Sequence, residues 1–240
     1  MKVGVYGLGR FGHFWAGSLA QHFSVTAYSR SSGRQTPEGV RRVSEDELLQ
    51  SPVLFICTAI SAFEEVIGKI GEKLLPGTLL IDTCSVKTHP VAVMERYVSE
   101  GVEILATHPM FGPDSARDGF DGLPMVLCPV RIEDKRLAKW KAFFQSLGLR
   151  VMVMTPQQHD REAAFTQGIT HFVGRVLADL DLQESSMATL GYRKLLEIRE
   201  QTCNDPWQLF LDLQRFNPYT EEMRQRLGRS LMRILEQLDG

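Results

Sequence analysis

The sequence predicts an α/β protein in which a doubly wound, mostly parallel sheet is followed by a smaller all-helical C-terminal domain. Over the first two-thirds of the 240 residues, short apolar runs alternate with helical patterns, as strands and crossover helices do in such sheets. A glycine-rich turn lies between the first apolar run and the first helical pattern. After Thr155-Pro156 only helical periodicity remains.

Each element has its own local signal. Ser44 is a good N-cap for a short helix, and Glu47 completes a capping box with it. Pro76-Gly77 ends a longer helix, and Pro90 is suited to the first turn of the next one. The expected strands are residues 3–6, 25–28, 53–58, 78–82, 102–107, 125–128 and 150–154. The expected helices in the same region are residues 11–22, 45–49, 62–75, 90–98 and 133–147.

The change of pattern at Thr155-Pro156 predicts a boundary between a Rossmann-type domain, residues 1–154, and a helical domain, residues 155–240. Turn signals divide the helical part at Gly191, at residues 204–206 and at residues 217–218. Its last helix carries an apolar stripe at i, i+3, i+4 spacing, formed by Leu227, Leu231, Ile234, Leu235 and Leu238. We expect so thin a domain to pack on the sheet domain, and on a second copy of itself.

Composition narrows the class of protein. Hydrophobic residues make up 43% and charged residues 23%, which is ordinary for a globular enzyme. The net charge of −2 does not favour a nucleic-acid or membrane-surface partner. The four cysteines are scattered without a C-x-x-C pair, which suits reduced thiols in the cytoplasm and no zinc site. No signal peptide and no run long enough to span a bilayer is expected.

The glycine turn is the cofactor signal. The segment Gly7-Leu8-Gly9-Arg10-Phe11-Gly12 has the form G-x-G-x-x-G in the strand–turn–helix context that this fingerprint requires. Its glycines let the backbone approach a pyrophosphate, and the N–H groups of the helix that follows then face the phosphate charge. We therefore predict a dinucleotide site here; the alternative is a tight turn that binds nothing.

The residues at the end of the second strand predict which dinucleotide the protein binds. NAD-binding chains place an acidic residue here for the ribose 2′-hydroxyl. This chain has Ser29-Arg30-Ser31 instead, followed by Ser32-Gly33-Arg34. Hydroxyls and a guanidinium suit a 2′-phosphate through charge-assisted hydrogen bonds. We predict NADP in preference to NAD; the alternative is a solvated basic loop.

Three further polar segments follow strands at the carboxyl edge of the sheet, where open α/β sheets hold their ligands. They contain Thr58 and Ala59, then Ser85 and Lys87, then His108. A neutral imidazole at this edge can take a hydroxyl proton during hydride transfer, and Ser85 can hydrogen-bond the same hydroxyl. Lys87 is interpreted either as an anion contact or as a surface lysine.

These motifs together resemble the prephenate/arogenate dehydrogenases of tyrosine biosynthesis. The resemblance rests on the glycine fingerprint, on Asp82-x-x-Ser85-x-Lys87 and on His108-Pro109-Met110-x-Gly112. His159-Asp160 and His171-Phe172 look like the first helix of that family's C-terminal domain. The Ser29-Arg30-Ser31 segment and the stretch from Gly191 to Asn217 are most similar to arogenate-type members.

The resemblance implies oxidative decarboxylation of arogenate to tyrosine, or of prephenate to 4-hydroxyphenylpyruvate, with hydride transfer to NADP. His108 would be the base and Ser85 would orient the substrate hydroxyl. It also implies substrate contacts from His171 and from an arginine late in the helical domain, for which Arg199 is nearest although an insertion disturbs the register. Asp114 is either a contact for a substrate ammonium or a turn-forming residue.

Two other functions stay open at this stage. One is a different small NADP-dependent dehydrogenase or reductase acting on an imine or a β-hydroxy acid. The other is a non-catalytic NADP-binding regulator, which would need neither His108 nor Ser85. On the resemblance we expect a homodimer formed through the helical domain, acting on a small-molecule substrate. We also interpret Trp15, Trp140 and Trp207 as packing residues.

Overall fold

The computed structural model describes residues 1–239, which form two compact units, Met1–Pro156 and the chain from Gln157 onward. The expected boundary between residues 154 and 155 lies two residues before this division. The strands are β1 (Lys2–Tyr6), β2 (Ser24–Tyr28), β3 (Val40–Arg42), β4 (Val53–Ile56), β5 (Leu79–Asp82), β6 (Glu103–Pro109), β7 (Pro124–Arg131) and β8 (Arg150–Val153). The helices of the first unit are α1 (Arg10–Ala20), α2 (Glu45–Leu48), α3 (Phe63–Ile70), α4 (Thr88–Tyr97) and α5 (Asp134–Ser146).

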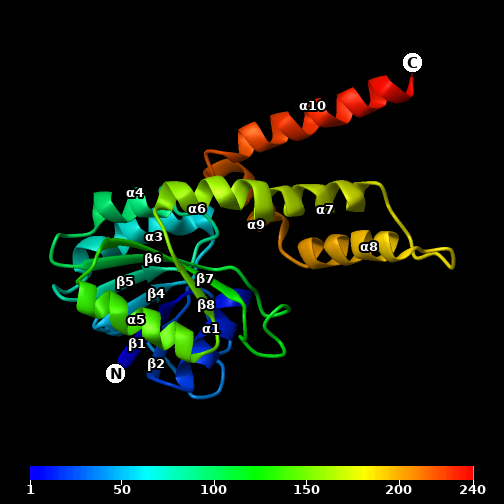
Figure 1. The fold of residues 1–240 in the computed structure, drawn as a ribbon. Coiled ribbons are helices and arrows are strands. Elements are labelled where there is room, and N and C mark those ends of the chain that lie inside the picture. The colour runs from blue at the N-terminus through cyan, green and yellow to red at the C-terminus, as the bar shows by residue number, and fades with distance from the viewer. Residues whose placement is uncertain (240) are drawn as a thin grey trace. The chain divides into compact units, whose positions relative to one another are not determined.

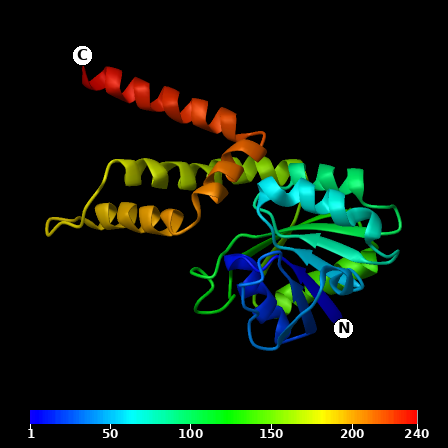
Figure 2. The ribbon, with the colours of Figure 1, turned by 180° about the vertical axis from the view of Figure 1, so that it is seen from behind.

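The first unit is built on one sheet with the strand order β3-β2-β1-β4-β5-β6-β7-β8. Every neighbouring pair is parallel except β6 and β7, which are antiparallel. Helices α3 and α4 cover one face of the sheet and α1 and α5 the other (Figures 1 and 2). The central strands β4 and β5 are buried along their whole length, as expected for a sheet covered on both faces. The predicted α/β fold is confirmed.

Three local predictions need correction. The three-residue strand β3 was not expected, because only one of its residues is apolar and buried. Helix α4 begins at Thr88, two residues before the expected start, although Pro90 lies in its first turn as predicted. Ser44 accepts a hydrogen bond from the Glu47 amide at 3.2 Å, as an N-cap should, but the Glu47 carboxylate pairs with Arg41 at 2.6 Å and not with the Ser44 amide.

The core between the sheet and helices α1 and α5 is aromatic. Trp15 and Trp140 are almost fully buried and pack against Phe55 and Phe144, with ring centroids 5.6 to 6.3 Å apart. Burial of large apolar side chains such as these is the main favourable contribution to the free energy of folding. The packing fixes α1, and with it the glycine turn that α1 follows.

The second unit is helical, as predicted. Helix α6 (Pro156–Ala163) continues through a π-helical turn (Ala164–Gly168) into α7 (Ile169–Asp179), and α8 (Leu190–Cys203), α9 (Trp207–Phe216) and α10 (Thr220–Leu238) follow. Helices α7 and α8 run side by side (Figure 1), where a Cβ on Gly174 would lie 2.0 Å from Thr202 Oγ1. Gly191 lies inside the first turn of α8, so the turn expected there was wrong.

Two apolar features of this unit are exposed. Trp207 packs its ring against Phe210, with centroids 4.9 Å apart, but is 56% exposed, so its interpretation as a packing residue holds only in part. The stripe on α10 is likewise exposed from Leu231 to Leu238, where the exposed fraction reaches 77%. Among residues 1–239, no helix combines the length and the apolar character that a membrane crossing needs.

Candidate active site

The glycine turn after β1 has a backbone that only glycine can adopt. Gly7 has a φ of +103°, and a Cβ there would lie 2.5 Å from the Cys57 carbonyl oxygen. A Cβ on Gly12 would lie 2.0 Å from the Gly7 carbonyl oxygen. The two glycines thus allow a tight turn and a close approach between α1 and the sheet.

The middle glycine of the motif, Gly9, leaves space for a ligand at the N-terminus of α1. Gly9 is the N-cap of α1, and no described heavy atom lies within 4 Å of the position that its Cβ would take. The first turn of α1 carries no acidic residue that would repel a phosphate. These features fit a dinucleotide pyrophosphate at the N-terminus of the helix.

The neighbouring strand end offers a second sign of a ligand. Thr58 Oγ1 is buried, and within residues 1–239 it has no hydrogen-bond partner. A buried hydroxyl is normally paired, so an unpaired one beside the glycine turn fits a bound cofactor. Ala59 follows as the N-cap of a short 3₁₀ helix, Ile60–Ala62. Leu8 is buried in the core and Phe11 stacks on Trp15, so in these two predicted cofactor residues the side chain packs inward.

The loop after β2 is rich in guanidinium groups. Arg30 and Ser31 are exposed there and Ser29 is buried. Arg30 Nη1 lies 3.2 Å from Glu65, and Arg34 Nη1 donates to the Leu8 carbonyl at 3.1 Å. Arg42 on β3, which sequence reasoning missed, donates to three carbonyls of this loop. The signal that could have indicated it is the pair of arginines at residues 41–42, shortly before helix α2.

The predicted catalytic pair lies at the ends of adjacent parallel strands. Asp82 on β5 pairs with Ala106 on β6, so Ser85 lies three residues and His108 two residues beyond the same rung. His108 is 2% exposed, and Ser85 is half-buried. The structure therefore brings the two predicted residues to one edge of the sheet, where a ligand is expected.

A buried hydrogen-bond network joins the two strand ends. Asp82 Oδ1 accepts from the Thr107 amide at 3.2 Å, and Oδ2 accepts from the Cys84 amide at 2.9 Å. Thr107 Oγ1 donates to the Asp82 carbonyl at 2.6 Å. Because Cys84 precedes Ser85 and Thr107 precedes His108, the network fixes the backbone on which both predicted catalytic residues stand.

Lys87 completes this network. Its side chain is fully buried, its ammonium pairs with the Asp82 carboxylate, and it donates to the Thr107 carbonyl. The interpretation of Lys87 as a surface lysine was therefore wrong; its ammonium pairs with the Asp82 carboxylate, and a contact with a substrate anion stays a prediction. The motif Asp82-x-x-Ser85-x-Lys87 is a loop closed by its own buried ion pair.

Two thiols near this edge are in surroundings that disfavour the thiolate. Burial raises the pKa of Cys57 to about 12, and burial together with the Asp82 charge raises the pKa of Cys84. Because the thiolate is the nucleophilic form, these surroundings do not favour either cysteine as a nucleophile.

The cofactor turn and the histidine loop are linked by an ion pair. Arg10 Nη2 lies 2.5 Å from Asp114 Oδ2, and both side chains are about half exposed. Asp114 is thus placed beside the glycine turn, although an exposed pair of this kind contributes little to stability.

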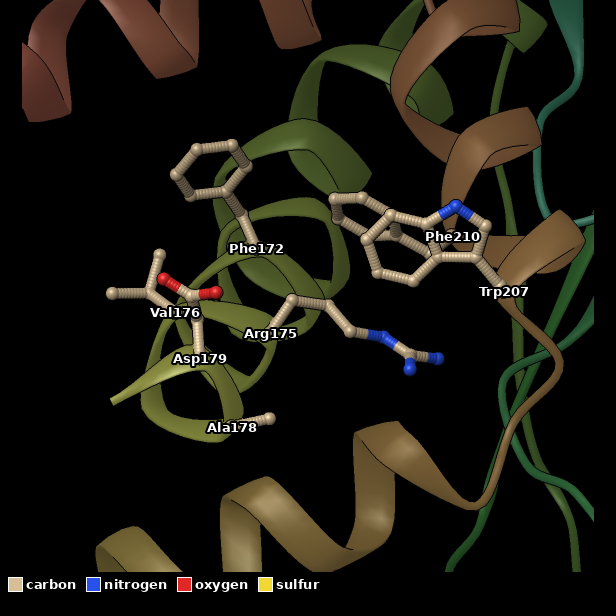
Figure 3. Close-up of a pocket in the computed structure, with 7 residues that line it drawn as sticks. All are labelled: Phe172, Arg175, Val176, Ala178, Asp179, Trp207 and Phe210. Carbon is tan, nitrogen blue, oxygen red and sulfur yellow. The ribbon is translucent and has the colours of Figure 1, made fainter. Parts of the chain in front are cut away.

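In the helical unit, His171 and Arg175 lie one turn apart on α7. His171 Nδ1 is buried and has no hydrogen-bond partner within residues 1–239, while Nε2 lies 3.9 Å from Asp205. Arg175 Nη2 donates to the carbonyls of Thr202 at 3.1 Å and Asp205 at 2.7 Å. Its guanidinium lies 5.1 Å from the ring centroid of Trp207, at a shallow hollow that also includes Phe172 and Phe210 (Figure 3).

The other predicted contact of this unit, Arg199, is placed elsewhere. Arg199 donates to the carbonyl of Leu182, which is eleven residues beyond His171 and follows the end of α7. The structure therefore does not bring Arg199 and His171 together. His159 is buried, and its Nδ1 lies 2.8 Å from Asp160 Oδ1.

Burial, together with the charge of Arg175, lowers the pKa of His171 from 6.5 to about 4. The unfolded chain therefore binds the additional proton between these pH values, and stability conferred by the neutral imidazole is lost as the pH falls. We expect this group to reduce the free energy of unfolding by roughly 2 kcal/mol between pH 7 and pH 5. Urea denaturation at both pH values should show a smaller pH dependence in His171→Gln; equal pH dependence in both proteins would contradict the assignment.

The chain is similar to known proteins along its whole length. The family model "Prephenate dehydrogenase, nucleotide-binding domain" matches residues 23–166, and "TYRAAT1-like, C-terminal domain" matches residues 176–240. Two Arabidopsis thaliana proteins, "Arogenate dehydrogenase 2, chloroplastic" and "Arogenate dehydrogenase 1, chloroplastic", are each 34% identical over the whole chain, which spans 70% and 39% of their lengths.

A solved structure agrees at the level of the fold. The structure of prephenate dehydrogenase from A. aeolicus in complex with hydroxyphenyl propionate and NAD+ superposes with a TM-score of 0.76 at 18% identity, covering 99% of this chain and 90% of that one. Among residues 1–239, no group of three or more metal-ligating side chains is found. The family model over more than half of the chain, and relatives that match the whole of it, lead to one conclusion: the chain belongs to the prephenate/arogenate dehydrogenase family of NAD(P)-dependent dehydrogenases.

Proposed function

We propose that this protein catalyses the oxidative decarboxylation of arogenate or prephenate with NADP as the hydride acceptor. The observation that carries the proposal is the placement of His108 and Ser85 on adjacent strand ends that a buried network ties together. The names of the two Arabidopsis relatives support arogenate as the better substrate.

In the proposed reaction His108 takes the proton of the substrate's ring hydroxyl, and Ser85 orients that hydroxyl by a hydrogen bond. When bound, the nicotinamide is the acceptor for the hydride that leaves the ring carbon bearing this hydroxyl. The ring carboxylate then departs as carbon dioxide, its bonding electrons make the ring aromatic, and the ring oxygen takes back the proton that His108 had accepted. Burial of His108 keeps bulk water from competing for the proton.

The chain's own residues fit NADP. Gly7, Gly9 and Gly12 would face the pyrophosphate, with Thr58 and Ala59 at the neighbouring strand end. Ser29, Arg30 and Ser31 would take the 2′-phosphate, because hydroxyls and a guanidinium form charge-assisted bonds to it. Residues 28–34, at the end of β2 and the start of this loop, include no acidic residue to favour the 2′-hydroxyl of NAD.

On the substrate side we propose His171 and Asp114 as contacts. His171 is neutral at neutral pH, so it would bind through a hydrogen bond from or to its unpartnered Nδ1. Asp114 would contact the ammonium group that arogenate has and prephenate lacks. Arg199 is left out of the proposed site because its guanidinium is bonded to Leu182.

The decisive experiment is steady-state kinetics with arogenate and prephenate, each with NADP and with NAD. We expect kcat/KM to be at least about tenfold higher with NADP, since loss of one charge-assisted contact is worth about that factor. Equal or better use of NAD would contradict the cofactor proposal. Turnover of neither substrate, with NADP still bound, would favour the non-catalytic regulator.

We further propose that the protein is a cytoplasmic homodimer formed through the helical unit. The exposed apolar stripe on α10 and the exposed Trp207 offer surface for a second copy. The four cysteines are free, as in a reducing compartment. A monomer in light scattering at micromolar concentration would contradict the dimer.

A further inference from the structure

The loop from Ser29 to Gly39 contains the predicted 2′-phosphate contacts but has no regular secondary structure of its own. The ladder between β2 and β3 ends at the pair Ala27 and Arg42. Beyond that pair, the loop has only one internal backbone hydrogen bond that is described, from the Arg34 amide to the Ser31 carbonyl at 3.3 Å. A loop of this kind needs side chains to fix its shape.

Arg42 supplies those side-chain bonds. Its Nη2 donates to the Ser29 carbonyl at 3.0 Å and to the Ser31 carbonyl at 2.9 Å, and its Nη1 donates to the Arg34 carbonyl. The planar fork of a guanidinium suits several acceptors at once, which a lysine ammonium on a flexible stem does not reproduce. One side chain thus binds three carbonyls in the first part of the loop, residues 29–34.

The loop is also attached to the glycine turn. Arg34 Nη1 donates to the Leu8 carbonyl at 3.1 Å, while the Arg34 carbonyl is held by Arg42. A chain of bonds therefore runs from β3, through Arg34, to the turn that would hold the pyrophosphate. This arrangement sets the position of Arg30 and Ser31 relative to that turn.

We propose that Arg42 is a positioning residue for NADP preference. It fixes the backbone of residues 29–34 so that Ser31 and Arg30, both exposed, present their polar groups to a 2′-phosphate. The inference rests on the proposed use of NADP and concerns how that preference is built. Arg42 acts through the loop backbone, so its fork matters as well as its charge.

The test compares Arg42→Lys, which keeps the charge and loses the fork, with Arg41→Lys. Arg41 is the matched control, because it precedes Arg42 on β3 and pairs with Glu47 instead of the loop. Calorimetric titration with ADP and with 2′-phospho-ADP, which differ only in the 2′-phosphate, isolates the contribution of that group, and kcat/KM is measured with NADP and NAD. We expect Arg42→Lys to lower the preference for the 2′-phosphate at least about tenfold in both measurements. Binding of ADP and use of NAD should stay within about threefold of the wild type.

The possible results distinguish failure of this inference from failure of the proposed use of NADP. A parallel loss with both cofactors, or with both ADP compounds, would make Arg42 merely structural and overturn the inference. An unchanged preference in Arg42→Lys together with a lost preference in Arg42→Leu would assign the effect to charge and also overturn it. A wild type without preference for NADP would overturn the proposed cofactor and this inference with it. A wild type that prefers NADP beside an unchanged Arg42→Lys would overturn the inference alone.

Discussion

Replacing His108 by asparagine is expected to lower kcat by at least about a hundredfold, because removal of a positioned general base typically costs about 10²- to 10⁴-fold. Asparagine keeps a polar side chain of similar size in a place that is 2% exposed, so the fold should tolerate it. It cannot accept and hold a proton at neutral pH. Steady-state kinetics at saturating substrate and NADP measures the effect.

The control is His22→Asn, at an exposed histidine after the end of α1, which should leave kcat within about twofold of the wild type. The dissociation constant for NADP in His108→Asn should also be unchanged, because the glycine turn does not depend on the imidazole. A kcat near that of the wild type would refute the base role. Loss of NADP binding would instead indicate that His108 supports the local fold.

The fold was predictable because its signals are local and periodic. Buried parallel strands such as β4 and β5 are continuous apolar runs, and the helices between them have the period of 3.6 residues. Strand β3 was not predictable in this way. It has three residues, two of them arginines, and its ladder depends on β2, so nothing in its own sequence marks it as a strand.

The candidate site was predictable where the strands and helices that flank a motif can be recognised in the sequence. The glycine turn follows a strand and begins a helix, and both Ser85 and His108 follow apolar strands, so the topology alone brings them to one edge. Contacts between residues on different helices of the second unit were not predictable. Arg199 was chosen by its distance along the sequence, but the register of α8 against α7 places it at the Leu182 carbonyl. Trp207 carries no local sign that its ring stays exposed in one chain.

Lys87→Met is expected to be the most destabilising single substitution at this site. It removes the ammonium from a fully buried pair and leaves the Asp82 carboxylate charged in the interior, where the amides of Cys84 and Thr107 still donate to it. Breaking a buried ion pair by removing one partner typically costs about 3–5 kcal/mol. The free energy of unfolding in urea is the measurement. Lys141→Met, at an exposed position on α5, should change it by less than about 0.5 kcal/mol.

The double variant Asp82→Leu/Lys87→Met separates the burial of a charge from the loss of packing. If the cost lies in the uncompensated carboxylate, removing both charges should recover most of the stability that Lys87→Met loses. Catalysis should not recover with it, because the donors and acceptors that hold the backbone beside Ser85 and His108 are still missing. A double variant as unstable as the single one would contradict the electrostatic cause. Recovery of both stability and kcat would show that the buried pair stabilises the fold without positioning the catalytic residues.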